Sequence, residues 1–338
     1  MHRMHRLIRP ATQSSRGGFT IIELLMVIII ISILVALLFP AIQNGFRSAR
    51  EAEVVAEIAN FDEAITSFKS RYGIDPPSFI VLYEQGAGVG DPDWSVDTTS
   101  GLTDGHRIAS RALIRQMWPD FNFAASRDIN GDGDSDDYLI LNGAECLVFF
   151  LGGVCETNVV DNQGNLRPSA SAGDPIEWWG PLGFSANPND PFRRGGNRVG
   201  PFFGDFVGGD GGRLRDVASA APDPDEQMPE YLDPLSSQVN PYLYVSSYDG
   251  AGYRPWGRDG TAGNIDDEIV GLSIHYLQDD GNPSTTSTLS YAPQTYQIIS
   301  PGFDTEYGTG GEYNGELIPS ARSFERDNIT NFQGGRLN

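Results

Sequence analysis

The chain has 338 residues, and its 23 basic and 45 acidic side chains give a formal net charge of −22. Nucleic-acid binding relies on clustered cations, so this balance argues against a nucleic-acid partner. Two cysteines, Cys146 and Cys155, are too few for a disulfide scaffold; they form either one disulfide or two free thiols. The 40 glycines and 22 prolines favour turns and loops over long helices, except in the first quarter of the chain.

That exception begins with a basic segment. Residues 1–18 contain four arginines and no acidic residue, and an apolar run then extends from Phe19 to Phe39 and ends at Pro40. Its polar residues are Thr20, Glu23 and Ser32. As a helix the run is roughly 31 Å long, enough to cross a hydrocarbon core of about 30 Å. The positive-inside rule predicts that residues 1–18 stay in the cytoplasm and that the chain after Pro40 lies outside it.

Two simpler explanations compete for this segment. A secretory signal peptide would carry a small-residue A-x-A cleavage site after the apolar run, and none follows. A plain signal anchor leaves Glu23 unexplained, because a carboxylate in a membrane helix costs about 2.5–3.5 kcal/mol on insertion and therefore needs a partner. Cleavage between Gly18 and Phe19 would create an α-amino group near membrane depth, which Glu23 of a neighbouring subunit could neutralise.

This N-terminus resembles the type IV pilin and type II secretion pseudopilin family. The resemblance rests on Gly18-Phe19-Thr20-Ile21-Ile22-Glu23, the unbroken apolar run and Pro40. It implies that a prepilin peptidase cuts after Gly18 and methylates Phe19, and that Glu23 directs docking onto other subunits. It further implies a single-pass protein of the cytoplasmic membrane, assembled with itself and other pilins or pseudopilins by an inner-membrane platform.

A helical period continues beyond Pro40. Apolar residues spaced four and three apart form one stripe: Val54, Ile58, Phe61, Ile65, Phe68 and Tyr72. We predict one helix over residues 19–72, with a membrane and assembly part at 19–40 and an amphipathic stem at 41–72. Pro40 and Gly45 are places where it can kink, and Gly73 stops it.

Residues 73–338 form the predicted head, rich in glycine, proline and aspartate. We expect short helices at 107–117 and 145–151, and strands at 242–245, 269–277 and 296–299, the last two joined by a hairpin-like stretch. Residues 158–174 and 204–230 are expected to be surface loops or partly disordered. The predicted fold is α+β and pilin-like: a long membrane helix continues into a stem packed on a small antiparallel sheet with large loop-rich insertions.

Scattered pieces of the head resemble the major, G-type pseudopilin of type II secretion. They are the helix exit at 70–78, Asp233-Pro234 with Asn240-Pro241-Tyr242-Leu243-Tyr244, and the loop from Ser300 to Asp304. The resemblance implies a pseudopilus subunit with a calcium loop containing Asp304. The sequence departs from the G-type pattern in that roughly 150 residues separate the first two pieces, more than a compact pseudopilin head needs. A type IV pilus subunit, major or minor, is the alternative.

A second candidate metal site is the acidic loop at 128–137. Its oxygen-bearing side chains fall at positions 1, 3, 5, 7 and 9: Asp128, Asn130, Asp132, Asp134 and Asp136. With glycine at position 6, this is the spacing of an EF-hand loop and predicts Ca²⁺. Position 12 is Leu139 instead of the usual glutamate; Asp137 or Glu145 could replace it, or the loop is simply a solvated turn.

Catalytic motifs are missing from the sequence. It has no His-Glu-x-x-His, no phosphate-binding glycine loop and no nucleophile elbow. Beyond residue 18 only His106 and His275 remain, and the apolar alternation around His275 predicts a core or edge position. We therefore expect a structural subunit and no enzyme. The alternative from another class is a membrane-tethered periplasmic binding protein or hydrolase.

Overall fold

A computed structural model describes residues 18, 20–98, 102–160, 166–167, 176–209, 211–215, 228–254, 275–279, 287, 289–316 and 318–337. The chain divides into two compact units, Met1–Ala49 and Arg50–Asn338, which are described separately below.

The predicted long helix is confirmed. Helix α1 runs over Ile21–Tyr72 and contains Pro40 inside it. The helix ends at Gly73, which has a φ of +82° and donates its amide hydrogen to the Lys69 carbonyl at 2.8 Å. This left-handed residue is a common C-terminal cap, because it satisfies a carbonyl that has no partner in the next turn.

In the first unit, α1 is apolar and uncovered. Every residue from Ile21 to Ala49 is exposed, and an 18-residue window of α1 reaches a mean hydropathy of 3.2. By length and composition this helix can cross a membrane. Such a large apolar surface needs a cover of lipid or protein.

In the second unit, the C-terminal part of α1 carries the core. The predicted stripe is buried at Val54, Ile58, Phe61, Ile65 and Phe68. Phe61 packs in an aromatic cluster, with its ring centroid 4.6 Å from Phe203 and 5.1 Å from Tyr242. Burial of these side chains holds the stem on the head, since each contributes about 1.5–3 kcal/mol of transfer free energy.

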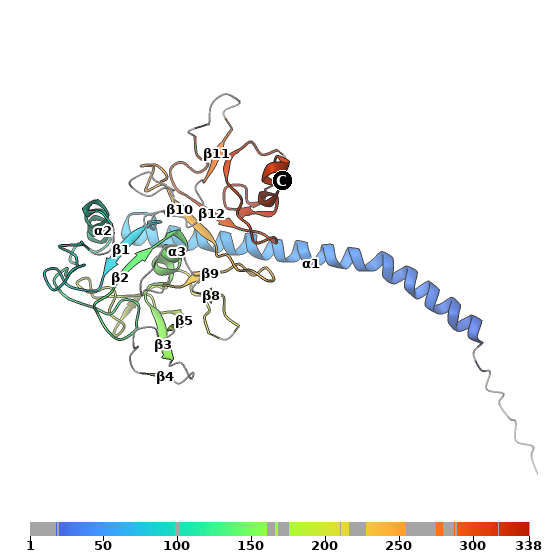
Figure 1. Ribbon diagram of the computed structural model, residues 1–338, viewed down its shortest axis with the longest axis horizontal. Coiled ribbons are helices and arrows are strands. Elements are labelled where there is room, and N and C mark those ends of the chain that lie inside the picture. The colour runs from blue at the N-terminus through green and yellow to red at the C-terminus, as the bar shows by residue number, and fades with distance from the viewer. Residues whose placement is uncertain are drawn as a thin grey trace, which may run out of the picture. The chain divides into compact units, whose positions relative to one another are not determined.

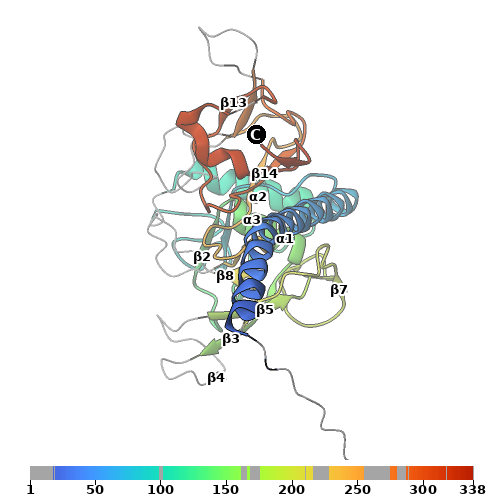
Figure 2. The same ribbon diagram turned by 90° about the vertical axis from the view of Figure 1, so that its right-hand side faces the viewer.

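The stem packs on a four-stranded antiparallel sheet, as predicted. Its strands, in spatial order, are β10 (Leu243–Ser246), β12 (Tyr296–Ser300), β14 (Ile329–Thr330) and β15 (Gly335–Arg336). Alternation gives the sheet two apolar faces: Tyr244 and Ile298 belong to the core that contains α1, while Val245 and Ile299 belong to a second cluster. Figure 1 shows β11 (Tyr276–Gln278) on one side of the stem part of α1 and β3 (Cys155–Val160), β4 (Leu166–Arg167) and β5 (Ile176–Pro181) on the other. Figure 2 shows β13 (Gly311–Tyr313) on the side opposite β3, β4 and β5.

The other elements are short. The helices are α2 (Asp104–Met117), α3 (Gly143–Gly152) and the 3₁₀ segment η1 (Ser320–Asp327). The strands outside the main sheet are β1 (Ile80–Tyr83), β2 (Tyr138–Leu141), β3 (Cys155–Val160), β4 (Leu166–Arg167), β5 (Ile176–Pro181), β6 (Phe184–Ser185), β7 (Arg198–Val199), β8 (Leu214–Arg215), β9 (Glu230–Tyr231), β11 (Tyr276–Gln278) and β13 (Gly311–Tyr313). Both predicted helices and the strands at 242–245 and 296–299 are present within a few residues.

The predicted hairpin-like stretch is present in part, because Leu277 forms an antiparallel bridge with Ser290, but the strand at 269–277 does not pair with the strand at 296–299. Residues 269–274 lie outside the described residues, and β11 pairs in parallel with β13 instead of with β12. The link to β12 is the fully buried Gln297 side chain. Gln297 Oε1 accepts a hydrogen bond from the backbone amide of Tyr276 at 2.9 Å, and Gln297 Nε2 donates to the Tyr276 carbonyl at 2.9 Å. A side-chain amide thus takes the place of a backbone ladder.

The loops predicted at 158–174 and 204–230 are also corrected where they are described. Strand β3 extends to Val160 and pairs with β4 and β5. Phe206 and Leu214 are buried, and β8 pairs with β9. Glycine-rich composition concealed these short pairings, because two-residue strands carry no periodic signal. The rest of both segments lies outside the described residues.

Of the two possibilities left open by the sequence, the structure has the thiols: Cys146 and Cys155 are both buried and are not joined by a disulfide. Burial raises the pKa of Cys155 to about 12, so its thiol is unreactive at neutral pH.

We expect His275 to make stability depend on pH. Its Nε2 lies 2.7 Å from Ser290 Oγ, its ring stacks on Tyr253, and burial lowers its pKa to about 4. The unfolded chain takes up this proton near pH 6.5, so the stabilisation is complete above that pH and is lost as pH falls toward 4. Chemical unfolding at pH 7 and 4.5 should show a loss of about 2 kcal/mol that His275→Gln removes. An unchanged pH dependence in the variant would contradict this expectation.

Candidate functional site

The N-terminal motif lies at the start of α1. Gly18 is exposed, and Phe19 lies outside the described residues. The Glu23 carboxylate accepts from the Thr20 amide and from Thr20 Oγ1, each at 2.8 Å, and Thr20 Oγ1 accepts from the Glu23 amide at 3.3 Å. This reciprocal pair is a capping box, which satisfies amides that have no partner in the first turn of a helix.

The same geometry leaves Glu23 available to a neighbour. Its side chain is exposed at the N-terminal end of an apolar helix, and Pro40 is exposed further along. Within the described residues, Glu23 pairs with Thr20 and with no cation. Docking of Glu23 onto the α-amino group of another subunit remains a prediction.

Four carboxylates meet at one end of the β1–β2 ladder. One oxygen from each of Glu84, Asp132, Asp134 and Asp137 lies within 4.8 Å of the others, the one such group that the described residues form. We call these residues the acidic cluster. Strand register explains the meeting: Tyr83 pairs with Tyr138, and the Glu84 amide donates to the Asp137 carbonyl at 3.0 Å.

The structure brings together only part of the ligand set predicted from the loop. Asp132 and Asp134 belong to the acidic cluster, whereas Asp128 and Asp136 do not. Asp128 accepts from the Gly131 amide at 2.5 Å, and Asn130 donates through Nδ2 to Asp137 at 3.1 Å. Of the two suggested replacements for position 12, Asp137 is in the cluster.

Glu145, the other suggested replacement, has a different role. Its carboxylate accepts from the Asn142 amide at 2.8 Å in the capping box of α3. The ligand set predicted from the sequence does not include Glu84, which precedes the loop by more than 40 residues. The available signal was its place directly after the four apolar residues 80–83, a strand that was not predicted.

The acidic cluster gathers four carboxyl groups in a partly buried place. Glu84 is fully buried; its Oε1 accepts from the amides of Ile129 and Asn130, and its Oε2 has no hydrogen-bond partner. Burial raises the pKa of Glu84 to about 9, and burial with the neighbouring carboxylates raises the pKa of Asp137 to about 7. A bound cation would relieve both costs.

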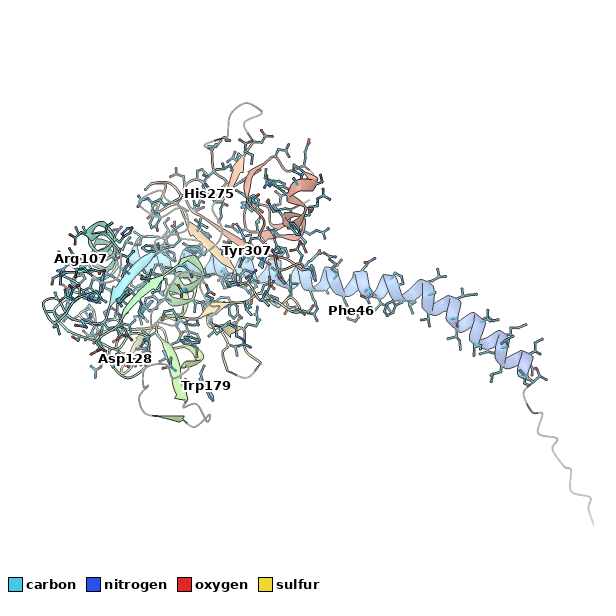
Figure 3. All side chains as sticks on the ribbon, viewed as in Figure 1. Phe46, Arg107, Asp128, Trp179, His275 and Tyr307 are labelled. Atoms are coloured by element: carbon cyan, nitrogen blue, oxygen red, sulfur yellow. The ribbon has the colours of Figure 1, made fainter. Side chains whose placement is uncertain are left out.

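The Asp304 loop is a separate place. Figure 3 shows the labels of Asp128 and Tyr307 well apart on the head. The Asp304 carboxylate accepts from the Glu306 amide at 2.9 Å, and Asp327 accepts from the amides of Phe303 and Asp304. Asp304 takes part in no group of three or more carboxylates within the part of the chain that the structure describes.

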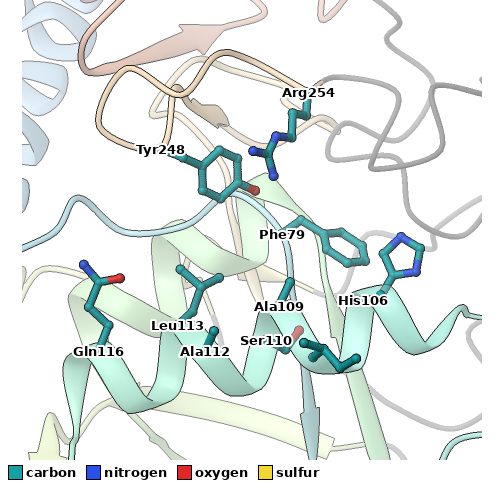
Figure 4. A pocket seen from close by; sticks show the side chains of 11 residues that line it. Phe79, His106, Ala109, Ser110, Ala112, Leu113, Gln116, Tyr248 and Arg254 are labelled. Carbon is teal, nitrogen blue, oxygen red and sulfur yellow. The ribbon is translucent and has the colours of Figure 1, made fainter.

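A pocket of about 600 Å³ lies between α2 and the loop that bears Tyr248 and Arg254 (Figure 4). Its polar side chains make structural hydrogen bonds. Ser110 Oγ accepts from the Val81 amide at 2.9 Å, and His106 Nδ1 lies 2.9 Å from Thr103 Oγ1 at the start of α2.

Comparison with known proteins gives one match. Residues 13–39 match the family model of the prokaryotic N-terminal methylation motif. The chain carries a prepilin-type N-terminus. The motif supports the resemblance to type IV pilins and pseudopilins, and it implies processing by prepilin peptidase and assembly with other pilins. No curated protein and no solved structure matches the chain.

The motif and the fold agree. The matched residues end at Phe39, within the exposed apolar part of α1. The head that follows is α+β with small sheets. The N-terminal helix fits a single membrane anchor with the head outside the cytoplasm.

Proposed function

We propose that the chain is a structural subunit of a type II secretion pseudopilus, built into a filament through its N-terminal helix and without enzymatic activity. The observation that carries the proposal is the methylation motif at 13–39, followed by an apolar helix whose side chains are uncovered from Ile21 to Ala49. In the membrane, lipid covers this apolar surface. In a filament, the corresponding helices of neighbouring subunits cover it.

The pseudopilus assignment is supported by the head pieces that resemble the G-type subunit. Asp233 is buried and accepts from the Leu235 amide and from Gln238 Nε2, each at 2.9 Å. Tyr244 Oη donates to the Pro76 carbonyl at 2.7 Å, which ties the helix exit to β10. Asp233 thus orders the turn that follows it, and Tyr244 joins β10 to the helix exit. A type IV pilus subunit has the same N-terminus and remains the alternative.

The competing class is a membrane-tethered hydrolase or binding protein that uses α1 only as an anchor. The structural hydrogen bonds of His106 and Ser110 favour the filament subunit over this class. Robust turnover of a sugar or peptide substrate by the purified chain, with no filament in cells that express it, would favour the tethered enzyme.

The first expected result is removal of residues 1–18 in cells that have prepilin peptidase. Loss of four arginines changes the formal charge from −22 to 19 − 45 = −26. Intact-mass measurement of the membrane fraction should find a chain that begins at Phe19 and carries one extra methyl group. The same cells without the peptidase are the control and should retain residues 1–18. A chain that keeps these residues in both strains would refute the processing step.

A further inference from the structure

We propose that the acidic cluster is a calcium site, in which Glu84 from the end of β1 joins Asp132, Asp134 and Asp137 of the following loop. This inference goes beyond the proposed function and does not depend on it, because it concerns only the Arg50–Asn338 unit.

The geometry brings one oxygen from each of the four carboxylates within 4.8 Å of the others. A central cation at the 2.3–2.6 Å distance typical of calcium would place its ligand oxygens at this spacing. Three of the four residues come from one decapeptide, and the fourth is fixed beside it by the ladder pairing of Tyr83 with Tyr138. The donors are thus positioned by the fold before any ion arrives.

The buried side chain of Glu84 supports a bound cation independently of the spacing of the carboxylates. It is fully buried, and its Oε2 has no hydrogen-bond partner. A buried carboxylate oxygen without a partner costs free energy, and a cation among the four carboxylates would remove that cost. Glu84 also explains the leucine at position 12: the carboxylate that an EF-hand takes from its own loop comes here from the neighbouring strand.

No described cation neutralises the cluster by an ion pair. The two nearby arginines form their hydrogen bonds with other groups, although Arg127 Nη1 is buried without a hydrogen-bond partner and the Arg127 charge acts on Glu84. Arg127 pairs with Asp190 at 3.2 Å and donates to the Asn122 carbonyl at 2.7 Å. Arg194 donates to the Ile129 carbonyl at 3.1 Å and to Thr157 Oγ1 at 3.4 Å. Arg127 therefore offsets part of the charge of Glu84, while the other three carboxylates of the cluster have no ion pair among the described residues and can take a cation from solution.

The donor chemistry selects the ion. All four donors are carboxylates, and neither histidine nor cysteine takes part, so zinc and other nitrogen- or sulfur-seeking metals are disfavoured. Up to eight carboxylate oxygens suit the six to eight ligands of calcium, while magnesium keeps its waters and requires an octahedron. Outside the cytoplasm millimolar calcium is common, so even a site of modest affinity would be filled.

The test is calorimetric titration of Ca²⁺ into the full chain, purified in detergent and freed of metal by chelator. Wild type should bind one calcium ion at this site, and a hundredfold higher concentration of Mg²⁺ should not displace it. Saturation should raise Tm by roughly 5 °C. A chain that binds no calcium, or that binds magnesium equally well, would overturn the proposal.

Two neighbouring aspartates provide a matched comparison. Asp137→Asn should weaken calcium binding at least tenfold, whereas Asp136→Asn, next to it but outside the acidic cluster, should change affinity less than threefold. If the loop bound calcium as a regular EF-hand, Asp136→Asn would weaken binding more than Asp137→Asn, because Asp136 occupies position 9. Equal effects of the two substitutions would show a diffuse acidic surface and would contradict a built site.

Glu84→Gln tests the strand-borne ligand and should also weaken binding at least tenfold. Since Glu84 is buried, its variant could fail to fold, so circular dichroism without calcium accompanies each titration. Asp134→Asn is the safeguard: its side chain is exposed, and its loss should lower calcium affinity without lowering the calcium-free Tm. Wild-type affinity in the Asp134→Asn chain would overturn the assignment.

Discussion

Replacing Arg213 by methionine is expected to destabilise the Arg50–Asn338 unit by about 3 kcal/mol. Arg213 forms two short hydrogen bonds with Glu57 of the stem, at 2.8 and 2.5 Å, and its guanidinium lies 4.3 Å from the ring centre of Tyr231. Glu57 is only 9% exposed and also accepts from Tyr242 Oη at 2.7 Å. Removal of the arginine leaves a buried carboxylate without its cation, which costs several kcal/mol.

The matched control is another stem-to-head ion pair. Arg336 Nη1 lies 3.2 Å from Glu51, and its side chain is 40% exposed. Since pairs in contact with water contribute about 0–1 kcal/mol, Arg336→Met should cost no more than that. Chemical unfolding of both variants measures the difference. Equal losses would show that the Glu57 contact does not hold the stem on the head.

Substitution of Glu23 by alanine should leave processing intact but lower filament yield at least tenfold. The variant should enter the membrane more readily, because it avoids the roughly 2.5–3.5 kcal/mol that a carboxylate costs on insertion. It would lack the charge that is proposed to meet the new α-amino group of a neighbouring subunit. Filaments sheared from equal numbers of cells and quantified by immunoblot measure the effect.

Ser32→Ala is the matched control, since Ser32 is a polar residue of the same apolar run. Its Oγ donates to the Ile28 carbonyl at 2.7 Å inside the helix, so it has no need of a partner from another subunit. Its filament yield should equal that of wild type. A normal yield from Glu23→Ala would refute the docking role.

The sequence predicts best what depends on local period. The stripe from Val54 to Phe68 and the stop at Gly73 follow from helical spacing and from the backbone freedom of glycine. Strands β10 and β12 are recognisable because each is a short run of β-branched and aromatic residues.

What the sequence does not reveal are polar contacts between distant segments. Glu57 is not part of the apolar stripe that the sequence predicts, yet it forms buried hydrogen bonds with Arg213 and Tyr242, more than 150 residues away. Glu84 joins the acidic cluster through the pairing of β1 with β2, and the Gln297 side chain joins β12 to β11. In each case a buried polar side chain is satisfied by a partner that no local pattern indicates.

The central claim, assembly of a processed subunit through its N-terminal helix, is tested most directly by mass spectrometry of purified filaments. Filaments sheared from cells with active prepilin peptidase should contain this chain, beginning at a methylated Phe19. Detection of the chain only in the membrane fraction, or with residues 1–18 still attached inside filaments, would contradict the account.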